Sequence, residues 1–170
     1  GDQIVISSHS AHGIGANFDN SYSVLKQLPN MTQISTSSNG SLTMMANETT
    51  HFATLLQEPG YEDVFSVDNT KYDEKNSSRF TIDGKTLRVE SSAEFGAYQV
   101  NMASFIQLGK WFDYLRENDV YDNTKIIIVA DHGRDLEQFD TMTLNNGIDV
   151  EFYNPLMLVK DFNSRYLWYK

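Results

Sequence analysis

A long amphipathic stretch over residues 93–118 limits the fold more than any other feature of this sequence. Its apolar positions recur at alternating steps of three and four residues: Phe95, Tyr98, Met102, Phe105, Gly109 and Phe112. This spacing predicts an α-helix with one apolar face, and Ser91 or Ser92 is suited to cap its N-terminus. The polar positions predicted to face away are Gln99, Gln107, Lys110, Asp113 and Glu117. We expect the apolar stripe to belong to the core, and Gly109 on that stripe to let a neighbouring strand approach closely.

A run of branched apolar residues follows the predicted helix at 125–130, with the sequence Lys-Ile-Ile-Ile-Val-Ala. Four consecutive branched residues without polar alternation are typical of a strand buried on both faces, as in a parallel sheet covered by helices. Residues 154–159 have a similar pattern and predict a second strand of this kind. A long helix that leads into such a strand forms half of a right-handed β-α-β crossover. The sequence therefore predicts an α/β fold, and its 170 residues fit one domain over 1–170.

The N-terminal third alternates short apolar runs with turn-rich segments. Residues 4–6 predict a strand, and the polar residues 7–20 predict a loop. A short helix is predicted over 22–28 and is expected to stop at Pro29. Two further strands are predicted at 31–36 and 42–46, separated by a turn at 38–40.

Residues 58–92 form a polar excursion between the apolar segments. Within it, the Asp83-Gly84 pair predicts a two-residue hairpin that places Phe80 opposite Leu87. We expect the rest of the excursion to be a long surface loop, and such loops are often functional.

The charge balance excludes two classes of function. The chain has 13 basic and 23 acidic residues and a formal net charge of −10. Proteins that bind nucleic acids or anionic membranes need a basic surface, so this acidic balance argues against both functions. No cysteine is present, so disulfides, thiolate metal sites and cysteine nucleophiles are excluded. No apolar run is long enough to span a membrane, so we expect the chain itself to be soluble.

A candidate metal site follows the run at 125–130, in the tripeptide Asp131-His132-Gly133. Ligands of open α/β sheets bind beyond the carboxyl ends of the strands, which is where this tripeptide is expected. Asp131 offers an oxygen and His132 a nitrogen that suit a divalent metal, and Gly133 permits a sharp bend that turns both inward. The other interpretation is an ordinary polar turn. Arg134 could hold an anion by bidentate hydrogen bonds, or pair with a nearby surface acid.

The order of several segments resembles the sulfatase branch of the alkaline phosphatase superfamily, including the lipoteichoic acid synthases. The residues that carry the resemblance are the helix and turn at 114–124, the apolar run with Asp131-His132-Gly133, the segment 44–51 that ends in His51, and the Asn154-Pro155-Leu156 strand. The resemblance implies a three-layer α/β/α fold with a mainly parallel sheet, of which this chain would be the C-terminal part.

The resemblance also implies a function and a set of site residues. Asp131 and His132 would bind a catalytic divalent metal (Mn, Mg, Zn or Ca), while His51 and Arg134 would contact an anionic substrate. The larger protein would hydrolyse or transfer sulfate or phosphate esters at the extracellular face of the cell membrane, anchored by transmembrane segments. The family's nucleophile is not identified in this chain, so we expect the chain alone to be inactive. The alternative is a degenerate sulfatase-like domain that acts as a binding or structural module.

Overall fold

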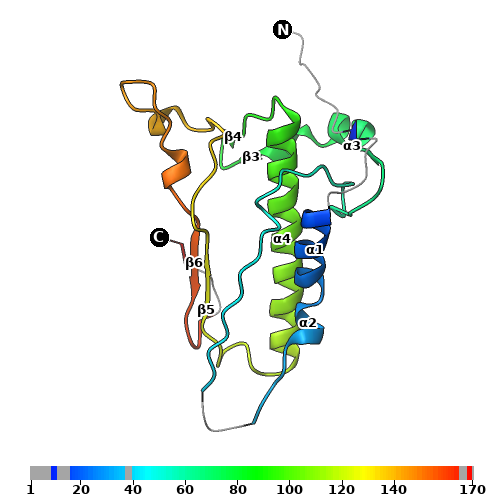
Figure 1. Ribbon diagram of the computed structural model, residues 1–170, viewed down its shortest axis with the longest axis vertical. Coiled ribbons are helices and arrows are strands. Elements are labelled where there is room, and N and C mark those ends of the chain that lie inside the picture. Colours follow the sequence, from blue (N-terminus) through cyan, green and yellow to red (C-terminus); the bar gives the residue numbers. More distant parts are fainter. Residues whose placement is uncertain (1–8, 11–15, 37–39, 165–167, 170) are drawn as a thin grey trace. The chain divides into compact units, whose positions relative to one another are not determined.

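The computed structural model describes residues 9–10, 16–36, 40–164 and 168–169. The chain divides into two compact units, Gly1–Tyr114 and Leu115–Lys170. Most of the helical structure belongs to the first unit, and a three-stranded sheet belongs to the second. Figure 1 shows the elements in chain order by colour.

The predicted long helix is confirmed as α4, Ser92–Glu117. Its N-terminus is closed by a reciprocal cap: the Ser91 hydroxyl accepts the backbone N–H of Glu94 at 3.3 Å, and the Glu94 carboxylate accepts the N–H of Glu90 at 2.7 Å. At its other end Asp119 adopts a left-handed conformation with φ of 58°, which breaks the helical path.

The buried surface of α4 differs from the predicted stripe. Gln99 and Gln107 were expected to face solvent, but both are buried, whereas Phe105 is exposed. Each buried glutamine side chain forms a hydrogen bond to a distant residue. Gln99 accepts the backbone N–H of Leu56 at 2.8 Å, and Gln107 donates to the Tyr22 hydroxyl at 3.0 Å. Periodicity alone assigns such residues to the outside because the partners are distant in sequence. The core cluster of this unit contains Phe18, Tyr22, Leu56, Tyr61, Val100 and Ala103.

The glycine that permits close packing on α4 is Gly96 and not Gly109. A Cβ atom at position 96 would lie 2.8 Å from the Ala53 carbonyl carbon and 2.9 Å from the Thr54 nitrogen. At position 109 a Cβ would meet nothing within 4 Å. The prediction for Gly109 is therefore wrong, and the extended segment 53–56 approaches the helix one turn from its start instead.

Helical structure continues past the predicted stop at Pro29, but as a second short helix. Helix α1 spans Ala16–Lys26, so it takes in part of the predicted loop at 7–20, and α2 spans Leu28–Met31. Pro29 lies in the first turn of α2, where a missing N–H costs nothing, so it begins a second helix and does not end the first. The strand predicted at 4–6 lies outside the described residues.

The two strands predicted at 31–36 and 42–46 are not formed. Residues 32–36 and 40–48 have no helix or strand assignment and join no strand ladder in the described part of the chain. Leu42 and Met44 on this segment are almost fully exposed. A strand-like sequence pattern becomes a strand only where a partner supplies the hydrogen bonds. One of the two small sheets described in this unit pairs β1, His9–Ser10, with β2, Val67–Asp68, in antiparallel register.

The predicted hairpin in the polar excursion is confirmed. Strands β3, Thr81–Ile82, and β4, Lys85–Thr86, pair antiparallel, and the Leu87 N–H donates to the Phe80 carbonyl at 2.9 Å. Asp83 and Gly84 have φ of 50° and 76°, as a tight turn with two left-handed residues requires.

The remainder of the excursion is anchored and not a long surface loop. It contains α3, Thr70–Lys75, and the 3₁₀ turn η1, Ser77–Phe80. Arg79 donates to Glu58 at 2.7 Å and also to Asp73, and these three side chains, here called the acidic clamp, are largely buried. Burial raises the pKa of Glu58 while the Arg79 charge opposes that rise. The side-chain amide of Asn69, fully buried, adds bonds to the backbone of residues 56 and 58.

The sheet of the second unit differs from the predicted parallel arrangement. Strands β5, Ile126–Val129, β6, Met157–Lys160, and β7, Trp168–Tyr169, lie in that order, and both pairs are antiparallel. Ile126 is buried, but Ile127 is 56% and Val129 64% exposed. The prediction that β5 is buried on both faces is therefore wrong, and the pair that β5 forms with β6 is antiparallel. A three-layer fold with a larger parallel sheet stays a prediction.

A buried lysine closes the end of β6 in this unit. Lys160 Nζ donates to the Thr124 carbonyl at 2.8 Å and to the Tyr121 carbonyl, and it lies 4.3 Å from the centroid of the Tyr121 ring. Burial lowers the pKa of this ammonium group. These bonds tie the turn after α4 to the sheet.

Among the described helices, none combines the length and the apolar character needed to cross a lipid bilayer.

Candidate functional site

The Asp131-His132-Gly133 tripeptide lies where β5 ends. The Ala130 N–H donates to the Leu156 carbonyl at 2.9 Å and extends the pairing with the β6 segment by one residue. The chain then bends, and the Gly133 N–H donates to the Phe152 carbonyl at 2.7 Å. The tripeptide is therefore held at both ends by backbone bonds to residues 152–156.

Gly133 allows two backbone segments to lie unusually close. A Cβ atom at this position would lie 2.0 Å from the Glu151 carbonyl oxygen and 2.9 Å from that of Asn154. Real Cβ atoms essentially never lie nearer than 3.0 Å to such atoms. Position 133 therefore requires glycine because of its contact with the η3 turn, Glu151–Tyr153, while the predicted role of Gly133 in a sharp bend stays a prediction.

The side chains of Asp131 and His132 converge. The His132 backbone N–H donates to Asp131 Oδ1 at 3.0 Å, and Asp131 Oδ2 lies 3.7 Å from His132 Nε2. His132 Nδ1 lies 2.6 Å from the Gly133 carbonyl oxygen. A carbonyl only accepts hydrogen bonds, so Nδ1 carries the proton in the neutral ring and Nε2 keeps a free electron pair.

This donor set fits part of a metal site. Metal-binding histidines commonly donate their second ring N–H to a carbonyl, which directs the other nitrogen to the metal. Two ligands of one tetrahedral zinc ion, each about 2.1 Å from it, lie about 3.4 Å apart, close to the observed 3.7 Å. The Asp131 side chain is 89% and the His132 side chain 38% exposed, so both are open to a ligand. Among the described residues, no group of three or more potential metal ligands comes together.

An aromatic ring that the sequence did not single out lies against His132. The Phe152 ring stacks on the imidazole with centroids 4.4 Å apart and planes inclined by 18°. The Tyr153 ring meets the Phe152 ring edge-on, with centroids 5.5 Å apart. The only signal in the sequence is the proximity of these aromatics to the Pro155-Leu156 strand, and a contact over twenty residues leaves no local pattern.

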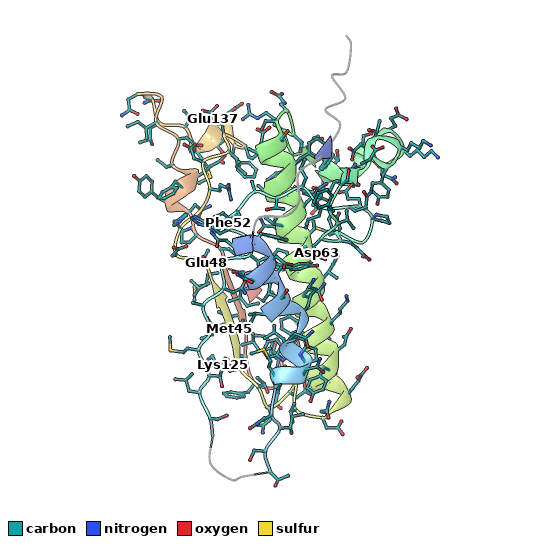
Figure 2. All side chains as sticks on the ribbon, turned by 45° about the vertical axis from the view of Figure 1, so that its right-hand side comes forward. Met45, Glu48, Phe52, Asp63, Lys125 and Glu137 are labelled. Carbon is teal, nitrogen blue, oxygen red and sulfur yellow. The ribbon has the colours of Figure 1, made fainter. Side chains whose placement is uncertain are left out.

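His51 lies in a turn of the first unit. The backbone N–H of His51 donates to the Glu48 carbonyl at 3.0 Å. The imidazole ring meets the Phe52 ring edge-on, with centroids 4.8 Å apart; Glu48 and Phe52 are labelled in Figure 2. Asn47 shapes this turn, because its side-chain oxygen accepts the Thr49 N–H and its amide donates to the Ser21 carbonyl. The exposed His51 belongs to one unit and Asp131 to the other, so a shared site stays a prediction.

Arg134 follows the tripeptide directly and is exposed. Its role in holding an anion also stays a prediction.

Comparison of the chain with protein-family models, with curated proteins and with solved structures finds no match.

Proposed function

We propose that this chain is the C-terminal part of a metal-dependent, sulfatase-like enzyme that hydrolyses or transfers sulfate or phosphate esters. The observation that carries the proposal is the convergence of Asp131 Oδ2 and His132 Nε2 at the end of β5, with Nδ1 held by the Gly133 carbonyl. An oxygen and a nitrogen donor on adjacent residues, one with its tautomer fixed, form half of a four-ligand site.

The residues have separate tasks in this proposal. Asp131 and His132 hold a divalent cation, which when bound supplies a Lewis acid for the ester group. His51 and Arg134 contact the sulfate or phosphate oxygens by charge-assisted hydrogen bonds. A local positive charge is needed in any case, since a chain with net charge −10 repels an anionic ester.

The wider setting follows from the family resemblance and is part of the proposal. The nucleophile and the remaining metal ligands come from other parts of a longer protein, which is anchored by transmembrane segments and acts at the extracellular face of the membrane. The chain alone is then expected to bind metal and to turn over neither aryl sulfates nor phosphodiesters.

Metal titration of the 170-residue chain tests the proposal. Isothermal titration calorimetry with Mn²⁺ and with Zn²⁺ is carried out on the chain and on the variants Asp131→Asn and His132→Gln. Asp135→Asn is the matched control, because it removes an exposed carboxylate from the same loop without touching either ligand. We expect binding by the chain and the control, and at least tenfold weaker binding by each ligand variant.

The alternatives give different outcomes. Equal binding by the chain and both ligand variants would show that the metal lies elsewhere and would overturn the assignment. Absence of binding by the unaltered chain would instead favour a degenerate, non-catalytic module. Turnover of an aryl sulfate by the chain alone would contradict the placement of the nucleophile outside it.

A further inference from the structure

The imidazole of His132 is constrained from two directions. The hydrogen bond from Nδ1 to the Gly133 carbonyl lies along one edge of the ring, and Phe152 covers one of its faces. The first contact limits rotation within the ring plane, and the second limits tilting of that plane. Together they leave Nε2 on the side of Asp131 Oδ2.

Phe152 is itself held in place by the backbone around it. Its carbonyl accepts the Gly133 N–H at 2.7 Å, which fixes it to the loop that carries His132. The neighbouring Glu151 is buried, and its carboxylate accepts the Phe139 N–H at 2.5 Å while its own N–H donates to Asp149 at 2.9 Å. The aromatic ring therefore stands on an anchored turn.

We infer that Phe152 is a positioning residue of the metal site, which holds the His132 ring with Nε2 directed at the metal. The presence of a metal in this inference rests on the proposed function. The contacts that hold the His132 ring are observed in the structure and do not depend on that function. Phe152 touches neither metal nor substrate in this role. It limits the ring orientations that His132 explores before binding, so that less rotamer freedom is lost when the metal binds.

The test compares three variants of the whole chain. Phe152→Leu removes the stacked ring and keeps an apolar side chain, Phe152→Tyr restores the ring, and Phe162→Leu removes an exposed aromatic ring from the same unit as a control. Long-range ¹H–¹⁵N spectra of the imidazole report which ring nitrogen carries the proton in the metal-free chain. Calorimetric titration with Zn²⁺ reports the affinity.

We expect the Nδ1-protonated tautomer to dominate in the unaltered chain, in Phe152→Tyr and in Phe162→Leu. Phe152→Leu should give a mixture of tautomers and Zn²⁺ binding about tenfold weaker. The unaltered chain also gives a reading that needs no variant, because a stacked Phe152 shifts the ring protons of His132 upfield.

Imidazole ring protons without an upfield shift would overturn the inference, and so would a Phe152→Leu chain in which either the tautomer or the Zn²⁺ affinity is unchanged. If the unaltered chain binds no Zn²⁺, the proposed metal site fails while the tautomer spectra still judge the positioning. If it binds Zn²⁺ equally well with and without the stacked ring, the positioning role fails and the metal site stands.

Discussion

Replacement of Gly133 by alanine tests the structural basis of the candidate site. The added Cβ would lie 2.0 Å from the Glu151 carbonyl oxygen, and ordinary contact begins at 3.4 Å, so the two segments must separate by about 1.4 Å. A shift of this size breaks the 2.7 Å hydrogen bond from the Gly133 N–H to the Phe152 carbonyl. It also moves the aromatic ring that stacks on His132.

The expected cost combines two terms. Overpacking of a tightly packed contact costs about 1–3 kcal/mol, and a lost backbone hydrogen bond adds about 1 kcal/mol. We therefore expect Gly133→Ala to lower the free energy of unfolding of the second unit by about 2–4 kcal/mol. The obstacle is backbone on both sides, so side-chain rotation offers no relief.

Urea unfolding followed by circular dichroism measures the change, and amide hydrogen exchange of β5 and β6 assigns it to the second unit. Gly109→Ala is the control, because it adds the same methyl group where no atom lies within 4 Å. A Gly133→Ala chain as stable as the unaltered chain, with unchanged exchange in β5, would refute the close contact and the rigid turn behind the site.

Three further predictions concern the first unit. Gly96→Ala should destabilise this unit by about 1–3 kcal/mol because the methyl group meets backbone. Gly109→Ala in the same helix should stabilise the unit by up to about 1 kcal/mol. Urea unfolding of both variants measures the two changes, and equal effects would contradict the prediction. Arg79→Met should cost about 3–5 kcal/mol because it leaves the two carboxylates of the acidic clamp without their cation, and a small loss in the same measurement would show that the clamp is not coupled to folding. Burial is the largest single influence on Asp63 and opposes its ionisation, but the hydrogen bonds that the carboxylate accepts and the charge of Lys26 together outweigh burial and lower the pKa of Asp63. The pair should therefore contribute up to about 1 kcal/mol to the free energy of unfolding. This contribution is present above the ordinary pKa of 3.8 and is lost as the pH falls through the lower folded value. The difference in unfolding free energy between the chain and Asp63→Asn should vanish from about pH 6 to about pH 2, and a difference independent of pH would contradict the prediction.

The parts of the fold that local sequence determines could be predicted. The α4 helix and its cap depend on residues within one or two turns of each other, and the hairpin depends on the Asp83-Gly84 pair. The parts that depend on distant partners could not. Gln99 is buried because Leu56 needs an acceptor, and no periodicity in the helix reveals a partner 43 residues away.

The same division applies to the candidate site. The position of Asp131, His132 and Gly133 after an apolar run was visible in the sequence, but the backbone contact that requires glycine at position 133 was not. The stacked Phe152 was not, because the turn that carries it lies twenty residues further along the chain. Strand direction was also beyond reach: four branched residues fit β5 equally well in an antiparallel pair with one open face.

The seclusion of Lys160 gives the second unit a built-in reporter. Its Nζ is buried and bonded to two carbonyls, whereas the side chain of Lys125, just before β5, is 42% exposed. An amine-acylating reagent should label Lys125 within the native chain and reach Lys160 only during transient opening. The rate at which peptide mass spectrometry detects the adduct on Lys160 then reports how often the sheet separates from the turn that precedes it.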